Sequence, residues 1–384
     1  MVRRIAILGA TGSIGRSTLE VLAHTGGRER WRVTALTGAS NVALLAEQAV
    51  ATGAGVAVTS DPARYAELRE RLAGTGVEAA AGPEAVVSAA SGADCVMAAI
   101  VGAAGLAPTL AAARSGATVA LANKECLVSG GAFFLGEIEK GGARLVPVDS
   151  EHSAIFQALD RHAAPERVIL TASGGPFRDW PLERMAAATV AEAVAHPNWS
   201  MGAKISIDSA SMFNKGLEMI EAKWLFDLRP EQVEVVVHPQ SVVHSMVGYA
   251  DGALLAQMGP PDMRQPIAYA LSCPERATLP LRRLDFAALG RLDFMAPDPE
   301  RFPALRLARA ALEAGGSAGC AFNAAKETAL DAFIAGRLRF LEMARVVDET
   351  MEALSPCPAA GSLGEVLDLD ARARAIAEAR VAAL

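Results

Sequence analysis

The first 149 residues alternate between short apolar runs and longer segments in which apolar positions recur every three or four residues. Short apolar runs predict buried strands, and the helical spacing between them predicts amphipathic helices. Strands are predicted within residues 3–8, 32–38, 54–60, 93–100 and 117–125. Because strands that alternate with helices form parallel sheets, this part of the chain should be a doubly wound α/β domain.

The pattern changes after residue 149. Residues 234–259 alternate as strands do, whereas residues 214–226 have a helical period, so we expect an α+β catalytic domain over 150–278. Prolines punctuate residues 279–303 and indicate a linker. Helical patterns then dominate, predicting a C-terminal α-helical bundle over 304–384. A segment rich in glycine, proline and aromatic residues, at about 173–203, is expected to act as a lid.

Composition narrows the possible partners and locations. The chain has 384 residues, 52% of them hydrophobic, and a net charge of −7, which argues against nucleic acid as a partner. Asp94, Pro108, Arg114 and several glycines interrupt the long apolar stretch at 85–121, so no membrane span is expected. The five cysteines are scattered without a CxxC pair, which favours reduced thiols over structural zinc. The first strand begins near residue 3, leaving no room for a targeting peptide, so a cytoplasmic location is expected.

A glycine-rich turn follows the first predicted strand. Gly9, Gly12 and Gly15 allow a tight turn and let a pyrophosphate approach the N-terminus of the next helix. The motif predicts a Rossmann-like dinucleotide-binding domain over 1–149. The second strand ends in Gly-Ala-Ser-Asn at 38–41, without the acid that usually bonds the ribose of NAD. This run disfavours NAD and permits NADP, although it contains no basic residue for the 2′-phosphate.

Several dehydrogenase classes can be tested against the sequence. Tyr65, Tyr249 and Tyr269 are followed at the fourth position by Arg, Ala and Cys, so the Tyr-x-x-x-Lys pair of short-chain dehydrogenases is absent. The Cys/His clusters of zinc dehydrogenases are absent too. A semialdehyde dehydrogenase would need a nucleophilic cysteine, for which Cys126 is the one tempting candidate. A small packed thiol is the alternative interpretation of Cys126.

Carboxylates, hydroxyls and a lysine gather between residues 149 and 218. If residues 148–151 are extended, Asp149 and Glu151 project from the same face of a strand. A helix would present Asn214, Lys215 and Glu218 on one face, because they are three and four positions apart. An acidic pair that meets a helix-borne acid and a cation predicts a site for a hard metal ion beside a site for an anion.

Motifs along about residues 3–370 closely resemble the 1-deoxy-D-xylulose 5-phosphate reductoisomerase family. They are GATGSIG, ANKE, VDSEHSAIFQ, TASGGPFR, HPNWSMGAKISIDSASMFNKGLE, HPQSVVHSMV and GPPDMRQPI. The resemblance implies a homodimeric oxidoreductase of non-mevalonate isoprenoid biosynthesis, dependent on NADPH and on a divalent metal (Mg²⁺, Mn²⁺ or Co²⁺). The implied substrate is a small phosphorylated sugar, 1-deoxy-D-xylulose 5-phosphate, and the implied product is 2-C-methyl-D-erythritol 4-phosphate.

The resemblance also implies roles for individual residues. Asp149, Glu151 and Glu218 match the metal ligands, and Lys124 and His196 join them as catalytic residues. Substrate contacts are implied at Lys124, Ser150, Glu151, Ser173, His196, Trp199, Ser209, Asn214, Lys215 and Glu218, with the substrate phosphate at Ser173, Ser209, Asn214 and Lys215. Cofactor contacts are implied at Thr11, Gly12, Ser13, Ile14, Gly38, Ser40, Asn41, Asn123, Glu125, Gly202 and Met263.

The sequence leaves two other functional hypotheses open. A related NADP-dependent dehydrogenase of another small phosphorylated metabolite would turn over without a metal. A catalytically silent relative would bind the nucleotide without turnover, although the intact set of metal-binding carboxylates disfavours it.

Overall fold

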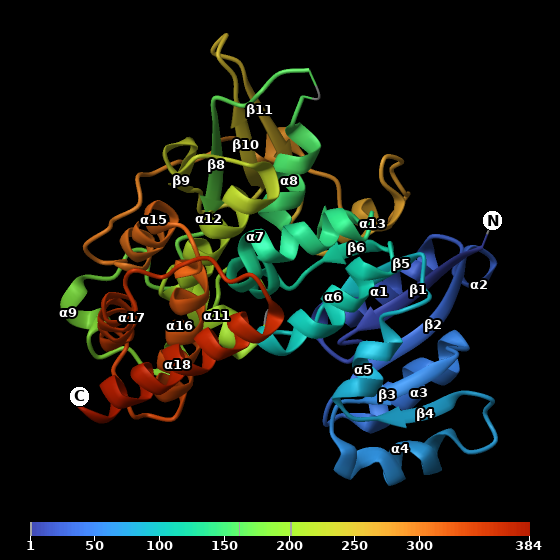
Figure 1. The fold of residues 1–384 in the computed structure, drawn as a ribbon. Coiled ribbons are helices and arrows are strands. Elements are labelled where there is room, and N and C mark those ends of the chain that lie inside the picture. The colour runs from blue at the N-terminus through green and yellow to red at the C-terminus, as the bar shows by residue number, and fades with distance from the viewer. Residues whose placement is uncertain (1, 161, 200–201) are drawn as a thin grey trace. The chain divides into compact units, whose positions relative to one another are not determined.

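The computed structural model describes residues 2–160, 162–199 and 202–384. They form two compact units, shown in Figure 1. The first unit comprises the described residues up to Cys126, together with Phe134–Ser153 and Asp262–Leu281. The second comprises Leu127–Phe133 and the described residues of Ala154–Pro261 and Arg282–Leu384. The chain therefore passes between the units several times.

A parallel seven-stranded sheet forms the centre of the first unit, with the strand order β4-β3-β2-β1-β5-β6-β7. The strands are β1 (Arg3–Leu8), β2 (Trp31–Gly38), β3 (Val56–Thr59), β4 (Glu78–Ala81), β5 (Cys95–Ala98), β6 (Thr118–Leu121) and β7 (Arg144–Pro147). This order confirms the predicted doubly wound fold. The sequence pattern missed β4 and β7, the two edge strands. Each has only four residues, and β4 reads Glu-Ala-Ala-Ala, which are poor strand formers.

Helices connect the strands of this sheet. They are α1 (Ser13–His24), α2 (Gly27–Arg30), α3 (Val42–Thr52), α4 (Tyr65–Leu72), α5 (Pro83–Ala89), α6 (Leu106–Arg114) and α7 (Lys124–Lys140), with short 3₁₀ turns at Pro62–Arg64 and Ala103–Gly105. The strand order reverses between β1 and β5. Since parallel crossovers are right-handed, the connections on either side of this reversal cover opposite faces of the sheet. A later helix, α13 (Arg264–Ser272), packs against α1, β6 and β7.

The glycine-rich turn lies beside this reversal of strand order. Gly9 has a φ of +85°, and a Cβ atom there would lie 2.5 Å from the carbonyl oxygen of Ala99, after β5. A Cβ atom on Gly15 would lie 2.4 Å from the carbonyl oxygen of Gly9. Only residues without a side chain let the backbone of β1, β5 and α1 approach this closely.

A mixed four-stranded sheet forms one layer of the second unit, in the order β11-β10-β8-β9. Its strands are β8 (Arg167–Ala172), β9 (Val233–Val237), β10 (Val243–Gly248) and β11 (Leu254–Met258). β8 and β9 are parallel, whereas β10 is antiparallel to β8 and to β11. Other elements of the region are α8 (Ser150–Ala158), which continues from the first unit, and α9 (Leu182–Met185), α10 (Val190–Ala193), α11 (Ala203–Ala210), α12 (Phe213–Phe226), a 3₁₀ turn at Pro230–Gln232 and α14 (Phe286–Leu289).

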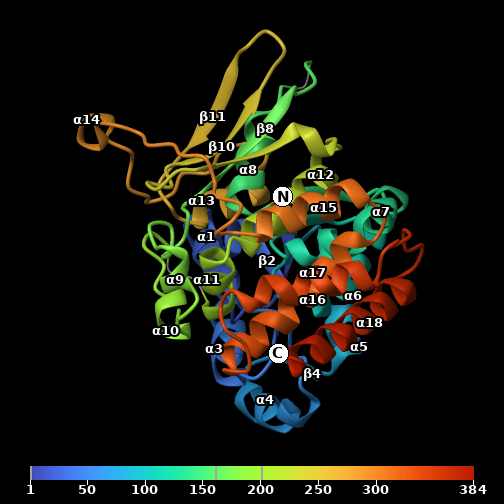
Figure 2. The same ribbon diagram turned by 90° about the vertical axis from the view of Figure 1, so that its left-hand side faces the viewer.

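The C-terminal helices of the second unit pack together, as Figures 1 and 2 show. They are α15 (Ala304–Ala314), α16 (Ala318–Ile334), α17 (Glu342–Ala353) and α18 (Leu363–Ala382), and they confirm the predicted helical region. Helix α12 packs closely against α15 and α16 at Gly216, where a Cβ atom would lie 3.1 Å from the side chains of Ala308 and Phe322. None of the helices in the described part of the chain has the length and apolar character needed to cross a membrane.

Adding one methyl group to the turn after β1 should test its close packing. We expect Gly15→Ala to destabilise the protein by about 1–3 kcal/mol, because its Cβ would overlap backbone atoms that cannot move aside. Gly12→Ala is the matched control within the same motif, since its Cβ would meet its nearest neighbour at 3.4 Å. Thermal unfolding of both variants measures the difference. Equal unfolding temperatures for the two variants would contradict this account of the turn.

Candidate active site

Asp149 and Glu151 lie where the edge strand β7 leads into helix α8. The prediction that residues 148–151 are extended is wrong, because β7 ends at Pro147 and α8 begins at Ser150. The backbone carbonyl of Asp149 accepts a hydrogen bond from the Ser153 N–H at 2.8 Å, so Asp149 precedes the first helical turn and Glu151 lies within it. Carboxylates at the start of a helix interact favourably with the positive end of the helix dipole.

Lys124 and His152 accompany Asp149 within the first unit. Lys124 opens α7 after the neighbouring strand β6, and its ammonium group forms an ion pair with the Asp149 carboxylate. The Nδ1 atom of the buried His152 lies 3.9 Å from the same carboxylate. The Ser150 hydroxyl donates to Glu151 at 2.6 Å. The unit therefore brings two carboxylates, a lysine and a histidine to the carboxyl ends of adjacent parallel strands, where α/β proteins bind ligands.

The helix α12 presents Asn214, Lys215 and Glu218 on one face, as predicted. The Asn214 amide donates to the Glu218 carboxylate at 2.5 Å, and the Lys215 ammonium group forms an ion pair with it. The side chains of Lys215 and Glu218 are 4% and 0% exposed. Losing one partner of a buried ion pair is strongly destabilising, so this pair fixes both groups.

Ser173 and Ser209 approach each other through the backbone of a tight turn. Gly175, with a φ of +66°, donates its N–H to the Ser173 hydroxyl oxygen at 3.1 Å. A Cβ atom on Gly175 would lie 2.8 Å from the carbonyl oxygen of Ser209, at the end of α11. The turn after β8 therefore packs directly on α11. The segments that carry Ser173 and Ser209, two residues of the expected phosphate site, are therefore in contact.

His196 is held in one neutral tautomer. Its Nδ1 atom accepts hydrogen bonds from the backbone N–H groups of Asn198 at 3.2 Å and Trp199 at 2.9 Å, so the ring proton resides on Nε2. Nε2 lies 2.9 Å from the Ser173 hydroxyl oxygen, to which it donates. Burial lowers the pKa of His196, which also favours the neutral ring. Because the Ser173 oxygen accepts from both Nε2 and Gly175, its own hydrogen is directed to a further acceptor.

The expected lid segment contains the short helices α9 and α10. Trp199 is half-buried, and its ring centroid lies 6.2 Å from that of His244 on β10. Gly202 is exposed and precedes the first turn of α11. Ser200 and Met201 lie outside the described residues. Closure of this segment over a ligand stays a prediction.

The first part of the expected cofactor site follows β1 and β2. Gly12 and Ser13 are exposed at the N-terminus of α1, where no side chain caps the helix, and Thr11 and Ile14 flank them. Backbone N–H groups of a helix N-terminus form a site for a phosphate group. A Cβ atom on Gly38, at the end of β2, would lie 3.3 Å from the Thr11 side chain, so the two turns are adjacent. Ser40 and Asn41 follow and are exposed, and Asn41 caps α3.

Other expected cofactor residues have structural partners. The buried Asn123 amide donates to the Gly102 carbonyl at 3.0 Å and accepts from the Cys126 N–H at 3.0 Å, which ties the start of α7 to the loop after β5. Glu125 lies in the first turn of α7, and Met263 precedes α13. The Cys126 thiol is fully buried, with its sulfur 3.7 Å from the Thr109 hydroxyl, which agrees with a packed thiol.

Some polar residues near these groups were missed by sequence reasoning. Asn198 holds His196 through its backbone, and its side-chain amide donates to the Pro239 carbonyl at 2.6 Å and to the Ser241 hydroxyl at 2.9 Å. Glu221 is 1% exposed and follows Glu218 by three positions on α12, a spacing that could have indicated it. No comparable sequence signal marks the partners of Asn198, which are more than forty residues away.

The fold and these side chains define the class of protein: an α/β oxidoreductase with a Rossmann-like domain. Models of 1-deoxy-D-xylulose 5-phosphate reductoisomerase match residues 5–131, and models of its C-terminal domains match residues 145–226 and 258–376. Proteins of that name from Rhizobium meliloti (strain 1021) and Agrobacterium fabrum are 62% and 59% identical to the chain. The alignments cover 97% of this chain and 96% and 95% of those proteins. The chain therefore belongs to the 1-deoxy-D-xylulose 5-phosphate reductoisomerase family.

Solved structures of the same family share the fold over the whole chain. The enzyme from Zymomonas mobilis, in complex with NADPH, is 50% identical to this chain, with a TM-score of 0.94. The alignment covers 100% of both chains. A second reductoisomerase, in complex with NADPH, fosmidomycin and magnesium, is 44% identical, with a TM-score of 0.95 over 99% of this chain and 98% of that one.

The tautomer of His196 can be tested by titration. We expect an NMR titration of the histidine ring nitrogens to place the pKa of His196 below the usual value of about 6.5, with the proton on Nε2. An unfolded chain binds this proton more readily, so wild-type stability should rise with pH between the lowered pKa and about 6.5. In His196→Phe this part of the pH dependence should be absent. A protonated Nδ1, or a pKa above 6.5, would contradict the proposed geometry.

Proposed function

We propose that this protein converts 1-deoxy-D-xylulose 5-phosphate to 2-C-methyl-D-erythritol 4-phosphate, oxidising NADPH to NADP⁺ in the presence of a divalent metal. The observation that carries the proposal is family membership, at about 60% identity to relatives of that name over 97% of the chain. The face of α12 that bears Asn214, Lys215 and Glu218 adds support, because it combines a cation and a carboxylate in the expected order.

The donor chemistry of the chain fits a hard divalent ion. We propose that Asp149, Glu151 and Glu218 hold it, since Mg²⁺ and Mn²⁺ prefer carboxylate oxygens. When bound, such an ion polarises a carbonyl group and stabilises negative charge that develops on oxygen. Lys124 pairs with Asp149, and Lys215 pairs with Glu218. A carboxylate binds a metal in its ionised form, and each of these two carboxylates lies beside a cation.

The phosphate group of the substrate is assigned to Ser173, Ser209, Asn214 and Lys215. Lys215 supplies positive charge, and Asn214 and the serines supply neutral donors. The Ser173 hydroxyl accepts from His196 and Gly175, so its hydrogen is directed to a phosphate oxygen. His196 orients this donor and stays neutral. Binding energy from the phosphate can position the reacting carbons, which lie elsewhere in the substrate.

NADPH supplies the hydride for the reduction, and we assign its binding to the first unit. The N–H groups at the start of α1, around Thr11–Ile14, receive the pyrophosphate, because they have no side-chain cap. Gly38, Ser40 and Asn41 lie beside this turn and supply donors without an acidic residue, which suits a 2′-phosphate better than a 2′-hydroxyl. Asn123, Glu125 and Met263 complete the proposed cofactor contacts of the first unit, and Gly202, at the start of α11, is a proposed contact from the second unit.

Three further features belong to the proposal. The enzyme acts as a homodimer, it is located in the cytoplasm, and it accepts Mn²⁺ or Co²⁺ as well as Mg²⁺.

The proposed reaction has a direct assay. NADPH oxidation should depend on both 1-deoxy-D-xylulose 5-phosphate and Mg²⁺ or Mn²⁺, and EDTA should abolish it. Product formation is checked by mass spectrometry of the methylerythritol phosphate. Turnover of another phosphorylated metabolite that survives EDTA would instead favour the related dehydrogenase. Binding of NADPH without any turnover would favour the silent relative.

Replacing the Glu218 carboxylate on α12 should impair metal binding while leaving nucleotide binding nearly unchanged. We expect Glu218→Gln to reduce turnover by on the order of a hundredfold or more, because it removes a proposed metal ligand. The variant should also weaken Mn²⁺ binding measured by equilibrium dialysis. NADPH affinity should be nearly unchanged, since Glu218 belongs to the second unit.

The control for this variant is Glu234→Gln, which removes an exposed carboxylate of β9 from the same unit. It should retain wild-type turnover and Mn²⁺ binding. If Glu218→Gln lost NADPH binding together with activity, or kept full Mn²⁺ affinity, the assignment of Glu218 as a metal ligand would be wrong.

A further inference from the structure

A buried lysine lies in the second unit, far along the chain from the expected site residues. Lys326, in the middle of α16, has a side chain that is only 3% exposed. Removing an ammonium group from water is energetically unfavourable unless a charged partner compensates for it. The Lys326 ammonium group donates to Asp208 on α11 at 2.9 Å, and the Asp208 side chain is 8% exposed. The pair therefore joins two helices that are distant in sequence.

Asp208 precedes Ser209, which belongs to the proposed phosphate site. The backbone of Ser209 packs on the turn that contains Ser173, where a Cβ atom on Gly175 would lie 2.8 Å from the Ser209 carbonyl oxygen. On the other side, α11 connects to α12 through Met212, whose φ of +63° makes a sharp turn. The position of α11 therefore sets how Ser209 lies relative to Ser173 and to the donors of α12.

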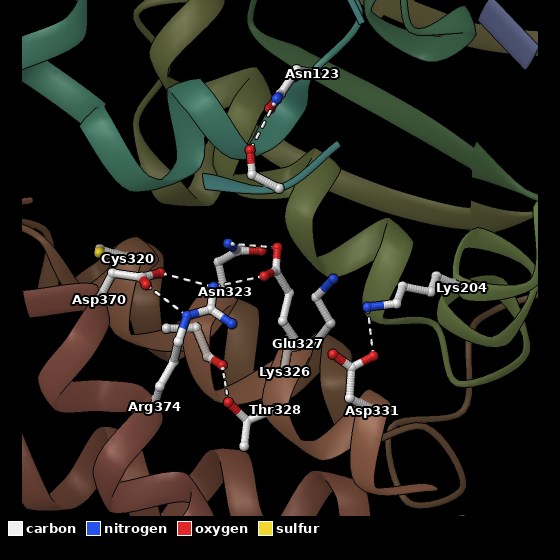
Figure 3. Close-up of polar contacts among 12 residues, drawn as sticks. Asn123, Lys204, Cys320, Asn323, Lys326, Glu327, Thr328, Asp331, Asp370 and Arg374 are labelled. Carbon is white, nitrogen blue, oxygen red and sulfur yellow. Dashed lines mark hydrogen bonds and ion pairs between the residues drawn. The ribbon is translucent and has the colours of Figure 1, made fainter. Parts of the chain in front are cut away.

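A second ion pair joins the same two helices at the surface. Lys204 lies one turn before Asp208 on α11, and its ammonium group is 2.5 Å from Asp331 on α16. Figure 3 shows this pair beside Lys326. Its side chains are 52% and 51% exposed, so water and salt weaken it, and such pairs contribute little to stability. Of the two, the buried pair is the one whose loss would remove a compensating charge from the core.

The α16 side of the buried pair is itself anchored. Glu327, the neighbour of Lys326, accepts from Asn323 at 3.3 Å and from Arg374 of α18 at 2.6 Å. Arg374 also donates to Asp370 at 2.6 Å, which Figure 3 shows. These contacts fix α16 against α18, so Lys326 extends from a firmly held helix. Lys326 can therefore hold Asp208, and with it the shorter helix α11, in place.

We infer that Lys326 is a positioning residue for substrate phosphate: through Asp208 it holds α11 so that Ser209 faces the same phosphate as Ser173 and Lys215. This inference rests on the proposed function, because it concerns the same phosphate site. Lys326 acts through Asp208 and itself makes no contact with the phosphate. It should therefore weaken binding of the sugar phosphate much more than binding of NADPH, because Gly202 is the one proposed cofactor contact at the start of α11 and the other proposed contacts lie in the first unit.

Steady-state kinetics of Lys326→Met and Lys326→Arg test the inference. For Lys326→Met we expect the KM for 1-deoxy-D-xylulose 5-phosphate to rise about tenfold, which corresponds to the loss of one well-placed donor. Both kcat at saturating substrate and the Kd for NADPH should change by less than about twofold. Lys326→Arg keeps the charge and should restore most of the affinity. Asp331→Asn, which breaks the exposed pair between the same helices, should keep the wild-type KM.

A second variant covers the case in which Lys326→Met does not fold because Asp208 loses its ion pair with Lys326. Asp208→Asn combined with Lys326→Met removes both charges from the core and should give a folded protein with the same raised KM. A folded Lys326→Met or double variant with the wild-type KM would overturn the inference. Equal losses of sugar-phosphate and NADPH affinity would also overturn it, since they indicate general unfolding. Lack of turnover by the wild type would contradict the proposed function itself, so the two failures are distinguishable.

Discussion

The burial of charge in the second unit constrains the rest of its structure. Two lysines are almost fully removed from water there, Lys215 beside Glu218 and Lys326 beside Asp208. An unpaired charge in such surroundings is strongly destabilising, so each lysine must stay within reach of its carboxylate. The first pair fixes side chains along α12, and the second fixes α11 against α16. Because α11 and α12 carry the residues assigned to the substrate phosphate, the contacts that stabilise the core also shape the site.

A steric constraint governs the first unit. Backbone atoms after β1 and β5 approach each other so closely that Gly9 and Gly15 cannot carry side chains. The N-terminus of α1 follows this close contact, has no side-chain cap and lies beside the point where the strand order reverses. Parallel strands direct the starts of α7 and α8 to the same edge of the sheet, where Lys124 and Asp149 form their ion pair. A nucleotide site and an acidic site thus arise from one property of the sheet, the common direction of its strands.

The parts of the fold that sequence patterns predicted are those with strong local signals. Residues 214–226 have a helical period, and the structure places Asn214, Lys215 and Glu218 together on α12. The extended conformation expected for residues 148–151 was wrong, because strand alternation and the start of a helix look alike over four residues. The edge strands β4 and β7 were missed since their four residues carry little pattern of their own. Pairing with neighbouring strands, and not local propensity, makes them strands.

The three segments assigned to the phosphate differ in what holds them, and this decides how far sequence can describe the site. Asn214 and Lys215 are held within their own helix, so their spacing alone predicts their arrangement. Ser173 depends on His196, 23 positions away, whose tautomer is set by two backbone N–H groups. Ser209 depends on a pair that spans 118 positions, between Asp208 and Lys326. A motif can therefore list the donors of such a site, whereas their relative placement depends on residues that the motif does not contain. Two chains with identical motifs can consequently differ in affinity for the same sugar phosphate when the buried partner of α11 differs.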